Sequence, residues 1–357
     1  MSELLAEEIF RKASESIDVL APPLQGVVDE ARAQRRRRRR VVAASVAAAV
    51  VVVAGLTWIG TRPPAEPDGI GPAKVTRATN PVDVGWYAAG KLHLDKVTVT
   101  VPDLTDFGEV NGGAVYGDRA GHVAFVDAQG EQRLIGTKAA GVPVVVSVGT
   151  GWAAWIEPVG NGGRIVVWDA VAGATLAELP VGRGVRLIAI DQDHVFYETP
   201  AGDYGWTPPN GEPVLLDRSG LIEVESATKV YQEGKSIDMV QPFFSVDYKR
   251  PGIDAILSPG GYYAVSSSPA NDGTPPFKPL LYDVRSGKSL PTGFAADDFA
   301  IDATFGDNHS VVYLVIYSGD IVAPHPLVVL RTCELGAARC SDVVPLSTNE
   351  GMPILGS

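Results

Sequence analysis

Histidines, cysteines and grouped carboxylates are the side chains in this sequence that could carry catalysis or hold a metal. The five histidines are widely separated, and no H-E-x-x-H motif, helical pair or His–carboxylate group is present. They are His93, His122, His194, His309 and His325. Four of them fall in or beside short, repeated apolar segments. We therefore interpret them as structural or surface residues and predict no catalytic and no metal residue.

Two groups of aspartates could supply the oxygen ligands that calcium prefers. They are Asp191 with Asp193, and Asp297 with Asp298 and Asp302. Neither group has the spacing of a known calcium loop, so we interpret both as solvated turns. Two Gly-Lys-Ser triplets lack the upstream glycine of a phosphate loop, and no G-x-S-x-G elbow is present. The sequence therefore predicts no cofactor.

The composition excludes several classes of protein. The chain has 357 residues, 45% of them apolar, a formal charge of −12 and two cysteines. Apolar content of this size supports a buried core, and the negative charge argues against nucleic-acid binding by the chain as a whole. Two cysteines are too few for a disulfide-knot scaffold or a Cys-based zinc finger.

One segment has the length and apolarity of a membrane helix. The run 41–59 has 19 residues without a charge and would span about 28 Å as a helix. Trp58 lies at one end, where an amphipathic ring favours the headgroup level. Arginines flank the other end: Arg35, Arg36, Arg37, Arg38, Arg39 and Arg40. The long basic region disfavours the alternative of a cleaved signal peptide. We predict a single-pass helix over 41–60 with its N-terminal side in the cytosol.

This topology divides the chain into four parts. Residues 1–40 form a cytosolic tail with short amphipathic helical stretches, which is either a partly ordered tail or a docking segment for a cytosolic partner. Residues 61–82 form a spacer rich in proline and glycine. Residues 83–357 form an extracytoplasmic domain. Cys333 and Cys340 would then lie outside the membrane, where a disulfide persists, and we predict that they pair.

The exterior domain repeats a short pattern. A turn residue followed by an apolar strand recurs with an average step of about 36 residues, at Gly90, Gly121, Gly151, Asp193, Thr228, Gly261 and Asn308. A second pattern, an apolar pair followed by Asp and then Gly, occurs at Asp127, Asp169, Asp217 and Asp283. Aspartate and glycine favour tight turns because the carboxylate accepts backbone N–H bonds and glycine adopts positive φ. About seven four-stranded units, with six to eight acceptable, predict an all-β propeller; a pair of β-sandwiches is the alternative.

The segments VVWDAVAG and LLYDVRSG resemble the blade turns of WD-repeat and TolB-type β-propellers. This resemblance implies a binding scaffold and no particular partner. The arginine run and the apolar segment that follows it resemble single-pass envelope proteins of actinobacteria, some of which lie beside sigma-factor regulators. That likeness implies a loose link to envelope signalling.

We therefore expect a non-catalytic binding or sensing module, anchored in the lipid bilayer of the cell membrane. A protein, peptide or wall component would bind one face of the propeller. The alternatives are a propeller hydrolase or lyase, and a structural envelope protein.

Overall fold

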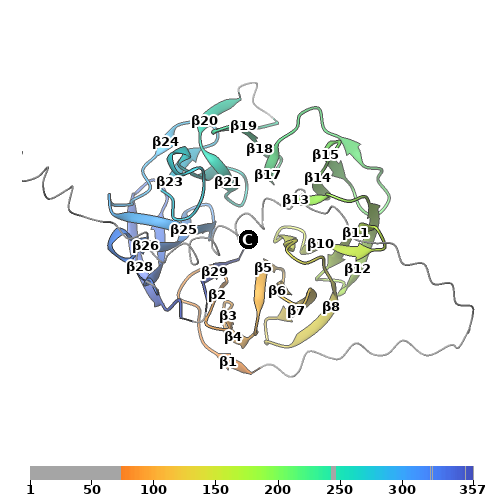
Figure 1. Ribbon diagram of the computed structural model, residues 1–357, viewed down its shortest axis with the longest axis horizontal. Coiled ribbons are helices and arrows are strands. Elements are labelled where there is room, and N and C mark those ends of the chain that lie inside the picture. The colour runs from red at the N-terminus through yellow and green to blue at the C-terminus, as the bar shows by residue number, and fades with distance from the viewer. Residues whose placement is uncertain (1–73, 243–246, 322, 324, 350, 357) are drawn as a thin grey trace, which may run out of the picture.

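The computed structural model describes residues 74–242, 247–321, 323, 325–349 and 351–356. These described residues form seven sheets that radiate from a central axis (Figure 1). The arrangement is a seven-bladed β-propeller, so the predicted all-β propeller is confirmed and the pair of sandwiches is not formed. Each sheet is antiparallel, and we number its strands outward from the axis.

The predicted cytosolic tail and membrane helix lie outside the described residues, as do the arginine run 35–40 and Trp58. Among the described residues, no helix is both long and apolar enough to cross a bilayer.

Sheet 1 contains both ends of the described chain. From the axis outward it is β29 (Ile354–Leu355), β2 (Trp86–Ala88), β3 (Lys91–His93), β4 (Val97–Thr100) and β1 (Val75–Arg77). The sequence assigned residues 61–82 to a spacer, whereas β1 pairs with β4 over Val75↔Val99 to Arg77↔Val97. This part of the assignment is wrong because the β-branched Val75 and Thr76 extend the sheet, so the propeller begins before residue 83.

The other sheets each use four consecutive strands. Sheet 2 is β5 (Leu104–Val110), β6 (Gly113–Asp118), β7 (His122–Asp127) and β8 (Gln132–Thr137). Sheet 3 is β9 (Val145–Ser147), β10 (Trp152–Val159), β11 (Gly162–Asp169) and β12 (Ala174–Val181). Sheet 4 is β13 (Arg186–Asp191), β14 (His194–Thr199), β15 (Gly202–Trp206) and β16 (Val214–Leu215).

Sheets 5 to 7 complete the ring. Sheet 5 is β17 (Leu221–Glu225), β18 (Thr228–Glu233), β19 (Ser236–Val240) and β20 (Tyr248–Pro251). Sheet 6 is β21 (Ile253–Leu257), β22 (Tyr263–Ser267), β23 (Pro279–Asp283) and β24 (Ser289–Leu290). Sheet 7 is β25 (Asp298–Phe305), β26 (Ser310–Tyr317), β27 (Val328–Glu334) and β28 (Arg339–Leu346). The short 3₁₀ helices η1 (Pro269–Asn271) and η2 (Ser318–Asp320) lie in the connections after β22 and β26.

The hydrophobic core is divided among the boundaries between neighbouring sheets. One cluster joins Val115 and Val123 of sheet 2 to Trp155 and Trp168 of sheet 3, and similar clusters occupy the other boundaries. The boundary between sheets 7 and 1 is filled in the same way, with Leu355 fully buried. Burial of apolar surface therefore favours a closed ring over a row of sheets.

The innermost strands bend around the axis at β-bulges. β5, β13, β17, β21 and β25 each contain a register shift against the second strand of their sheet. A bulge adds one unpaired residue, bends its strand and increases the local twist. The bulges thus curve the strands that surround the axis.

Candidate binding face

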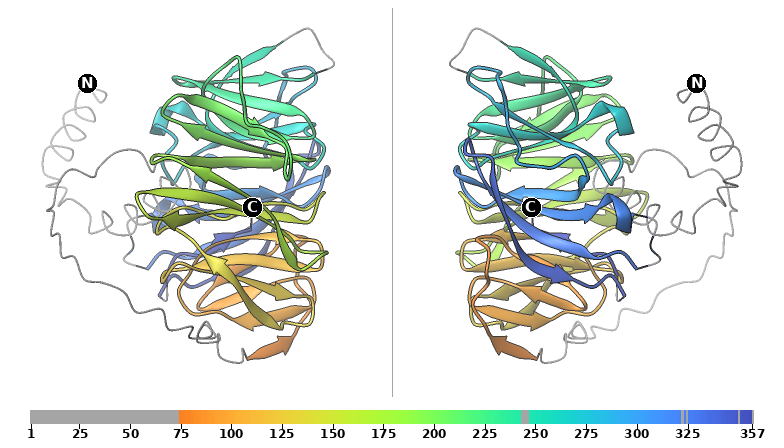
Figure 2. Two further views of the ribbon diagram at one scale, coloured as in Figure 1. Left: turned by 90° about the vertical axis from the view of Figure 1, so that its right-hand side faces the viewer. Right: turned by 90° about the vertical axis from the view of Figure 1, so that its left-hand side faces the viewer.

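Strand alternation sorts the connections of the propeller onto two faces (Figure 2). Connections between first and second strands, and between third and fourth strands, lie on one face. Connections between second and third strands, and between successive sheets, lie on the other. The described chain enters the ring on this second face, because β1 is antiparallel to β4 and begins beside Val99. We call it the entry face.

Acidic residues gather on the face opposite the entry face. We call this the acidic face. Its carboxylates are those of Asp83, Asp95, Glu109, Asp127, Glu131, Asp169, Asp191, Asp193, Glu212, Glu225, Asp247, Asp283, Asp307 and Glu334. Its lysines and arginines are Arg77, Lys96, Arg133, Arg285, Lys288 and Arg339. The loops of the entry face carry the two signs in near balance, so the negative charge of the propeller is polarised toward one face.

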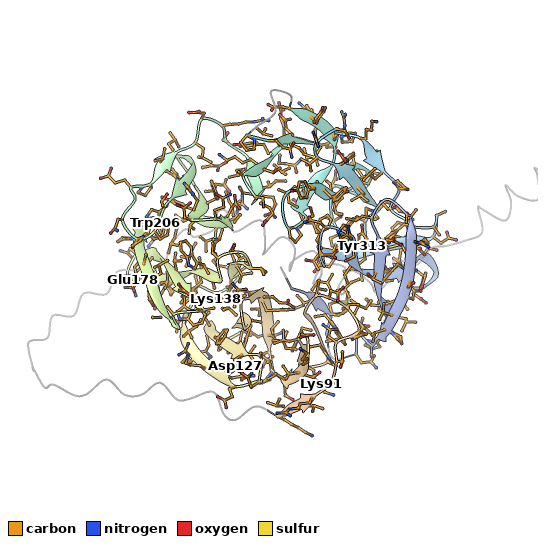
Figure 3. All side chains as sticks on the ribbon, turned by 180° about the vertical axis from the view of Figure 1, so that it is seen from behind. Lys91, Asp127, Lys138, Glu178, Trp206 and Tyr313 are labelled. Carbon is orange, nitrogen blue, oxygen red and sulfur yellow. A yellow bond between two sulfur atoms is a disulfide. The ribbon has the colours of Figure 1, made fainter. Side chains whose placement is uncertain are left out.

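Three of the predicted turn aspartates lie on the acidic face, each at the end of a third strand. Asp127, which is labelled in Figure 3, accepts the Gln129 and Glu131 N–H groups through its Oδ1 at 2.9 and 2.8 Å. Asp169 Oδ1 accepts the N–H groups of two residues of its own turn at 2.8 and 2.9 Å. Asp283 Oδ1 accepts the Ser286 N–H and hydroxyl, both at 2.7 Å. Neutral donors hold these carboxylates in place without cancelling their charge.

Asp217 differs from the other three turn aspartates. It follows β16, the fourth strand of sheet 4, and lies in the connection to sheet 5 on the entry face. The turn between β15 and β16 is instead the segment 207–213, which has no Asp-Gly pattern. The Asp-turn-Gly pattern marks a reversal of the chain and does not distinguish which strands the reversal joins.

The ends of inner strands also carry acids, and these acids join neighbouring sheets. Asp191 at the end of β13 accepts the N–H groups of Ser226 and Ala227 in sheet 5, at 2.8 and 2.7 Å. Glu225 at the end of β17 accepts the Gly260 N–H of sheet 6 at 3.3 Å. Burial raises the pKa of Glu225, the bond from Gly260 opposes that rise, and the charge of Asp191 adds to it. These bonds identify the two acids as braces between sheets.

Glu109 on β5 is the third such acid. Its carboxylate accepts the N–H of Gly85, which immediately precedes β2 in sheet 1. Burial raises the pKa of Glu109 to about 7; the Gly85 bond lowers it and the charge of Asp95 raises it further. No local pattern in the sequence predicts that Glu109 packs against the neighbouring sheet.

The two suggested calcium groups do not assemble as metal sites. Asp193 pairs with His194 at 2.7 Å, and Asp191 is bonded to sheet 5. Asp298 is paired with the guanidinium of Arg331. Within the described residues, no group of three or more His, Cys, Asp and Glu side chains has a geometry that could hold a metal ion.

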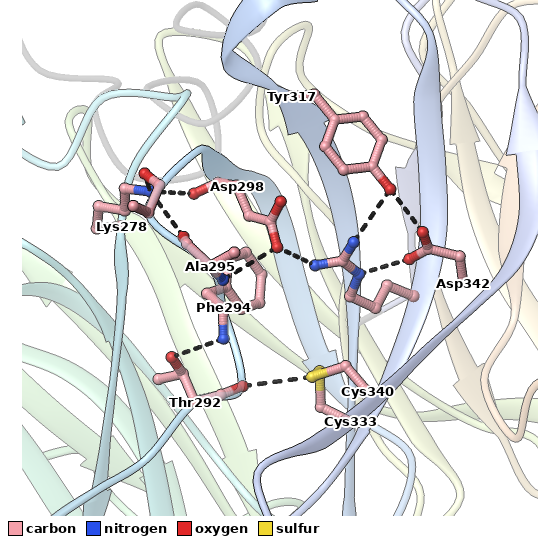
Figure 4. A network of polar contacts seen from close by, with 11 residues as sticks. Lys278, Thr292, Phe294, Ala295, Asp298, Tyr317, Cys333, Cys340 and Asp342 are labelled. Carbon is pink, nitrogen blue, oxygen red and sulfur yellow. Dashed lines mark hydrogen bonds and ion pairs between the residues drawn. A yellow bond between two sulfur atoms is a disulfide. The ribbon is translucent and has the colours of Figure 1, made fainter.

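A polar network joins sheets 6 and 7 near the entry face (Figure 4). Arg331 bridges Asp298 and Asp342, and its Nη2 donates to the Tyr317 hydroxyl at 3.1 Å. The bond that Tyr317 donates to Asp342 raises the Tyr317 pKa, with burial a smaller cause. Lys278 donates to the carbonyls of Ala295, Ala296 and Asp298. Tyr317, whose pKa is raised, and Arg331, which is paired with two carboxylates, therefore have a structural role in this network.

The predicted disulfide is present. Cys333 on β27 and Cys340 on β28 face each other across the sheet with Cα atoms 4.1 Å apart. The Sγ atom of Cys340 also lies 3.5 Å from the Thr292 carbonyl oxygen, in the connection between sheets 6 and 7. The disulfide therefore fastens the outer hairpin of the last sheet.

His93 lies in sheet 1 and is half-buried. Its ring stacks on Trp86 with centroids 3.6 Å apart and planes 5° apart, and it shares a hydrogen bond of 3.1 Å with Thr98. Burial lowers the His93 pKa to about 4, and the charge of Lys91 contributes. His122 lies in sheet 2, beside Asp118 at 2.8 Å. The separate surroundings agree with the interpretation of these histidines as structural or surface groups.

No protein-family model matches the chain, and no curated protein is similar to it. Several solved structures share its fold. The β-propeller domain of the Trilobed protease from Pyrococcus furiosus is 10% identical, with 79% of this chain and 98% of that chain covered and a TM-score of 0.53. A chain of a mitotic checkpoint complex is 10% identical, with 84% and 90% covered and a TM-score of 0.50. A putative TolB from Agrobacterium tumefaciens is 12% identical over 71% and 86%, with a TM-score of 0.39. At these identities the likeness shows the propeller fold alone.

Proposed function

We propose that this chain is a membrane-anchored, extracytoplasmic propeller that binds a protein partner through its acidic face, without catalysing a reaction. The observation that carries the proposal is the set of turn carboxylates held by neutral backbone N–H groups. The donors that hold Asp127, Asp169 and Asp283 are neutral N–H and hydroxyl groups, so these bonds leave the carboxylate charges in place. A partner that carries cationic side chains can therefore gain from these charges.

Exposed apolar side chains accompany these carboxylates. Val148 and Val171 of sheet 3 and Tyr262 of sheet 6 lie in loops of the acidic face and are 59%, 76% and 56% exposed. Protein interfaces gain most of their affinity from a few apolar or aromatic anchors, while surrounding charges set specificity and association rate. The chemistry favours a partner segment that combines lysine or arginine with apolar residues.

The anchor rests on the sequence. Residues 41–60 have the apolarity and flanking arginines of a spanning helix, and the described chain enters the ring on the entry face. The acidic face is opposite this entry and so would be directed away from an anionic membrane surface. The 40-residue cytosolic tail would connect the propeller to envelope signalling by binding a cytosolic partner. A pull-down with residues 1–40 tests this link directly.

A propeller hydrolase or lyase is the competing function. Such an enzyme would need an acid or base whose pKa lies near the working pH, and Glu109 has such a pKa. Its carboxylate is bonded to the Gly85 N–H, however, and this position favours a role in closing the ring.

Photo-crosslinking in intact cells tests the binding proposal. A photoreactive residue at Val171 on the acidic face should capture a partner, whereas one at Val159, 50% exposed at the entry-face end of β10, should not. Replacing Asp127, Asp169 and Asp283 with Asn keeps each turn acceptor and removes three charges, and should weaken capture at Val171 at least several-fold. The matched control replaces three entry-face residues, Asp103, Asp217 and Asp320, with Asn. Equal capture by both triple variants would contradict the acidic face as the binding surface.

The location is tested separately. Protease added to wall-stripped cells should digest the propeller and spare the first 40 residues. Protection of the propeller, with a surface control digested, would overturn the membrane topology and leave the crosslinking result standing.

A further inference from the structure

Gly85 is the residue at which three parts of the ring meet. Its N–H bonds to the Glu109 carboxylate of sheet 2, and its carbonyl accepts the Gly356 N–H at 3.0 Å, just after β29. A Cβ at position 85 would lie 2.4 Å from Glu109 Oε1 and 3.0 Å from the Phe107 ring. A side chain at position 85 would displace the Glu109 carboxylate, and the position of Glu109 and the closure by β29 are coupled through the N–H and the carbonyl of this one residue.

The closing strand is short. β29 pairs with β2 through Trp86↔Leu355 and Tyr87↔Ile354. Ile354 and Leu355 are 3% and 0% exposed, and they pack into the clusters on the two sides of sheet 1. Within the larger cluster between sheets 7 and 1, β29 itself is thus held by two buried side chains and a few backbone bonds, and a modest change in free energy can shift the balance between its paired and open states.

The surroundings of the Glu109 carboxylate disfavour its charged form. Asp95, in the turn between β3 and β4, is the charged group that acts on Glu109 within the described part of the chain, and its like charge raises the Glu109 pKa further. Lys96 pairs with Asp95 at 3.3 Å, but both side chains are about 80% exposed and water screens the pair. Asp83, two residues before Gly85, is a further acid in the segment packed against Glu109.

We propose that the proton on Glu109 controls how firmly β29 closes the propeller. With the carboxyl neutral, the group can stay buried against Gly85 and the closing strand remains paired. With the carboxyl ionised, opening of β29 admits water to the charge, and the open state is favoured. Because burial raises the Glu109 pKa to about 7, this change falls between pH 6 and pH 8.

The expected size follows from proton linkage. If opening returns the Glu109 pKa from about 7 toward its ordinary value of 4.5, the opening equilibrium increases about tenfold between pH 6 and pH 8. The same change of pH leaves strands far from the closure unaffected. This prediction concerns the ring itself and does not depend on the partner proposed above.

Hydrogen exchange of the full chain in detergent, followed by mass spectrometry and corrected for the intrinsic effect of pH, tests the proposal. Protection of the amides in Trp86–Ala88 and Ile354–Leu355 should fall about tenfold from pH 6 to pH 8, while amides of β18 stay constant. Glu109→Gln keeps an acceptor for Gly85 and should abolish the dependence on pH. The matched control is Glu131→Gln, an exposed acid of the same sheet, which should behave as the unmodified chain.

A second variant keeps the test decisive if Glu109→Gln folds poorly. Asp95→Asn removes the like charge that acts on Glu109 and should move the midpoint of the exchange profile to lower pH. A flat profile in the unmodified chain, a tenfold change that persists in Glu109→Gln, or a midpoint that Asp95→Asn leaves in place would each overturn the proposal.

Discussion

The ammonium of Lys138 lies 2.9 Å from the Asp106 carboxylate, and the two side chains are 1% and 9% exposed. Lys138 belongs to the connection between sheets 2 and 3, whereas Asp106 lies on the inner strand β5. Nζ of Lys138 also donates to the Val142 carbonyl at 2.8 Å, and the second oxygen of Asp106 accepts the Val144 N–H at 2.8 Å. The pair therefore fastens the connection to the wall around the axis.

Removing one partner of this pair should be costly. We expect Lys138→Met to lower the free energy of unfolding by about 3–5 kcal/mol, because Asp106 would be left as an unpaired buried charge. Urea denaturation at pH 7 measures the loss. Lys96→Met is the control: it removes an ion pair that is about 80% exposed and should cost less than about 0.5 kcal/mol. A loss below about 1 kcal/mol for Lys138→Met would show that the pair is not buried as described.

Gly136 should tolerate no larger residue. A Cβ there would lie 2.6 Å from the Trp155 indole, which is 1% exposed and cannot move aside. We expect Gly136→Ala to destabilise the protein by about 1–3 kcal/mol through overpacking. Gly182 has nothing within 4 Å of a built Cβ, so Gly182→Ala serves as the comparison and should be close to neutral. Thermal unfolding of both variants distinguishes packing from a general effect of glycine replacement.

The disulfide should stabilise the folded protein because it lowers the conformational entropy of the unfolded chain. Its cysteines are seven residues apart, and closing a loop of that size stabilises by about 2.5 kcal/mol in the chain-entropy model. Replacing both Cys333 and Cys340 with Ala should lower the unfolding free energy by about that amount. Reducing agent should produce a similar loss in the unmodified protein and none in the double variant; a loss in both would point to another effect of the reductant.

His93 should make the fold sensitive to acid. Its pKa is about 4 in the folded protein against 6.5 ordinarily, so between these values the unfolded chain binds a proton that the folded chain does not. Stability should therefore fall as pH decreases through this range, by about 1–2 kcal/mol after allowance for solvent screening. His93→Phe keeps a ring against Trp86 and should unfold with a smaller loss between pH 7 and pH 4.5. An equal loss in both proteins would assign the acid sensitivity to other groups.

The number of blades could be predicted because each sheet supplies one turn-and-strand signal. The signals do not mark equivalent strands, however. Those of sheets 3 to 7 fall on second strands, as with β10 and β26, whereas those of sheets 1 and 2 fall on the third strands β3 and β7. Glycines and short apolar runs indicate where the chain reverses. They therefore predict the number of hairpins, but not which strands of a sheet each hairpin joins.

The groups that join sheets could not be found in the sequence. Glu109 reaches Gly85 and Asp106 reaches Lys138 only after neighbouring sheets have packed together, and no spacing rule relates such residues. The disulfide could be predicted from the sequence because its two cysteines are close together and are the only cysteines in the chain. Asp217 shows that a local pattern can also mislead. Its sequence pattern matches that of the other three turn aspartates, but it lies on the entry face and they lie on the acidic face.

The placement of β1 and β29 in one sheet has a mechanical consequence. A load applied through residue 74 reaches β1 first, at the rim, where three residues pair with β4. Three strands then separate that rim from β29 beside the axis. Pulling on the N-terminal side would therefore separate β1 from β4 before force reaches the pairing of β29 with β2, so the ring of a tethered propeller would stay closed under a load that detaches β1.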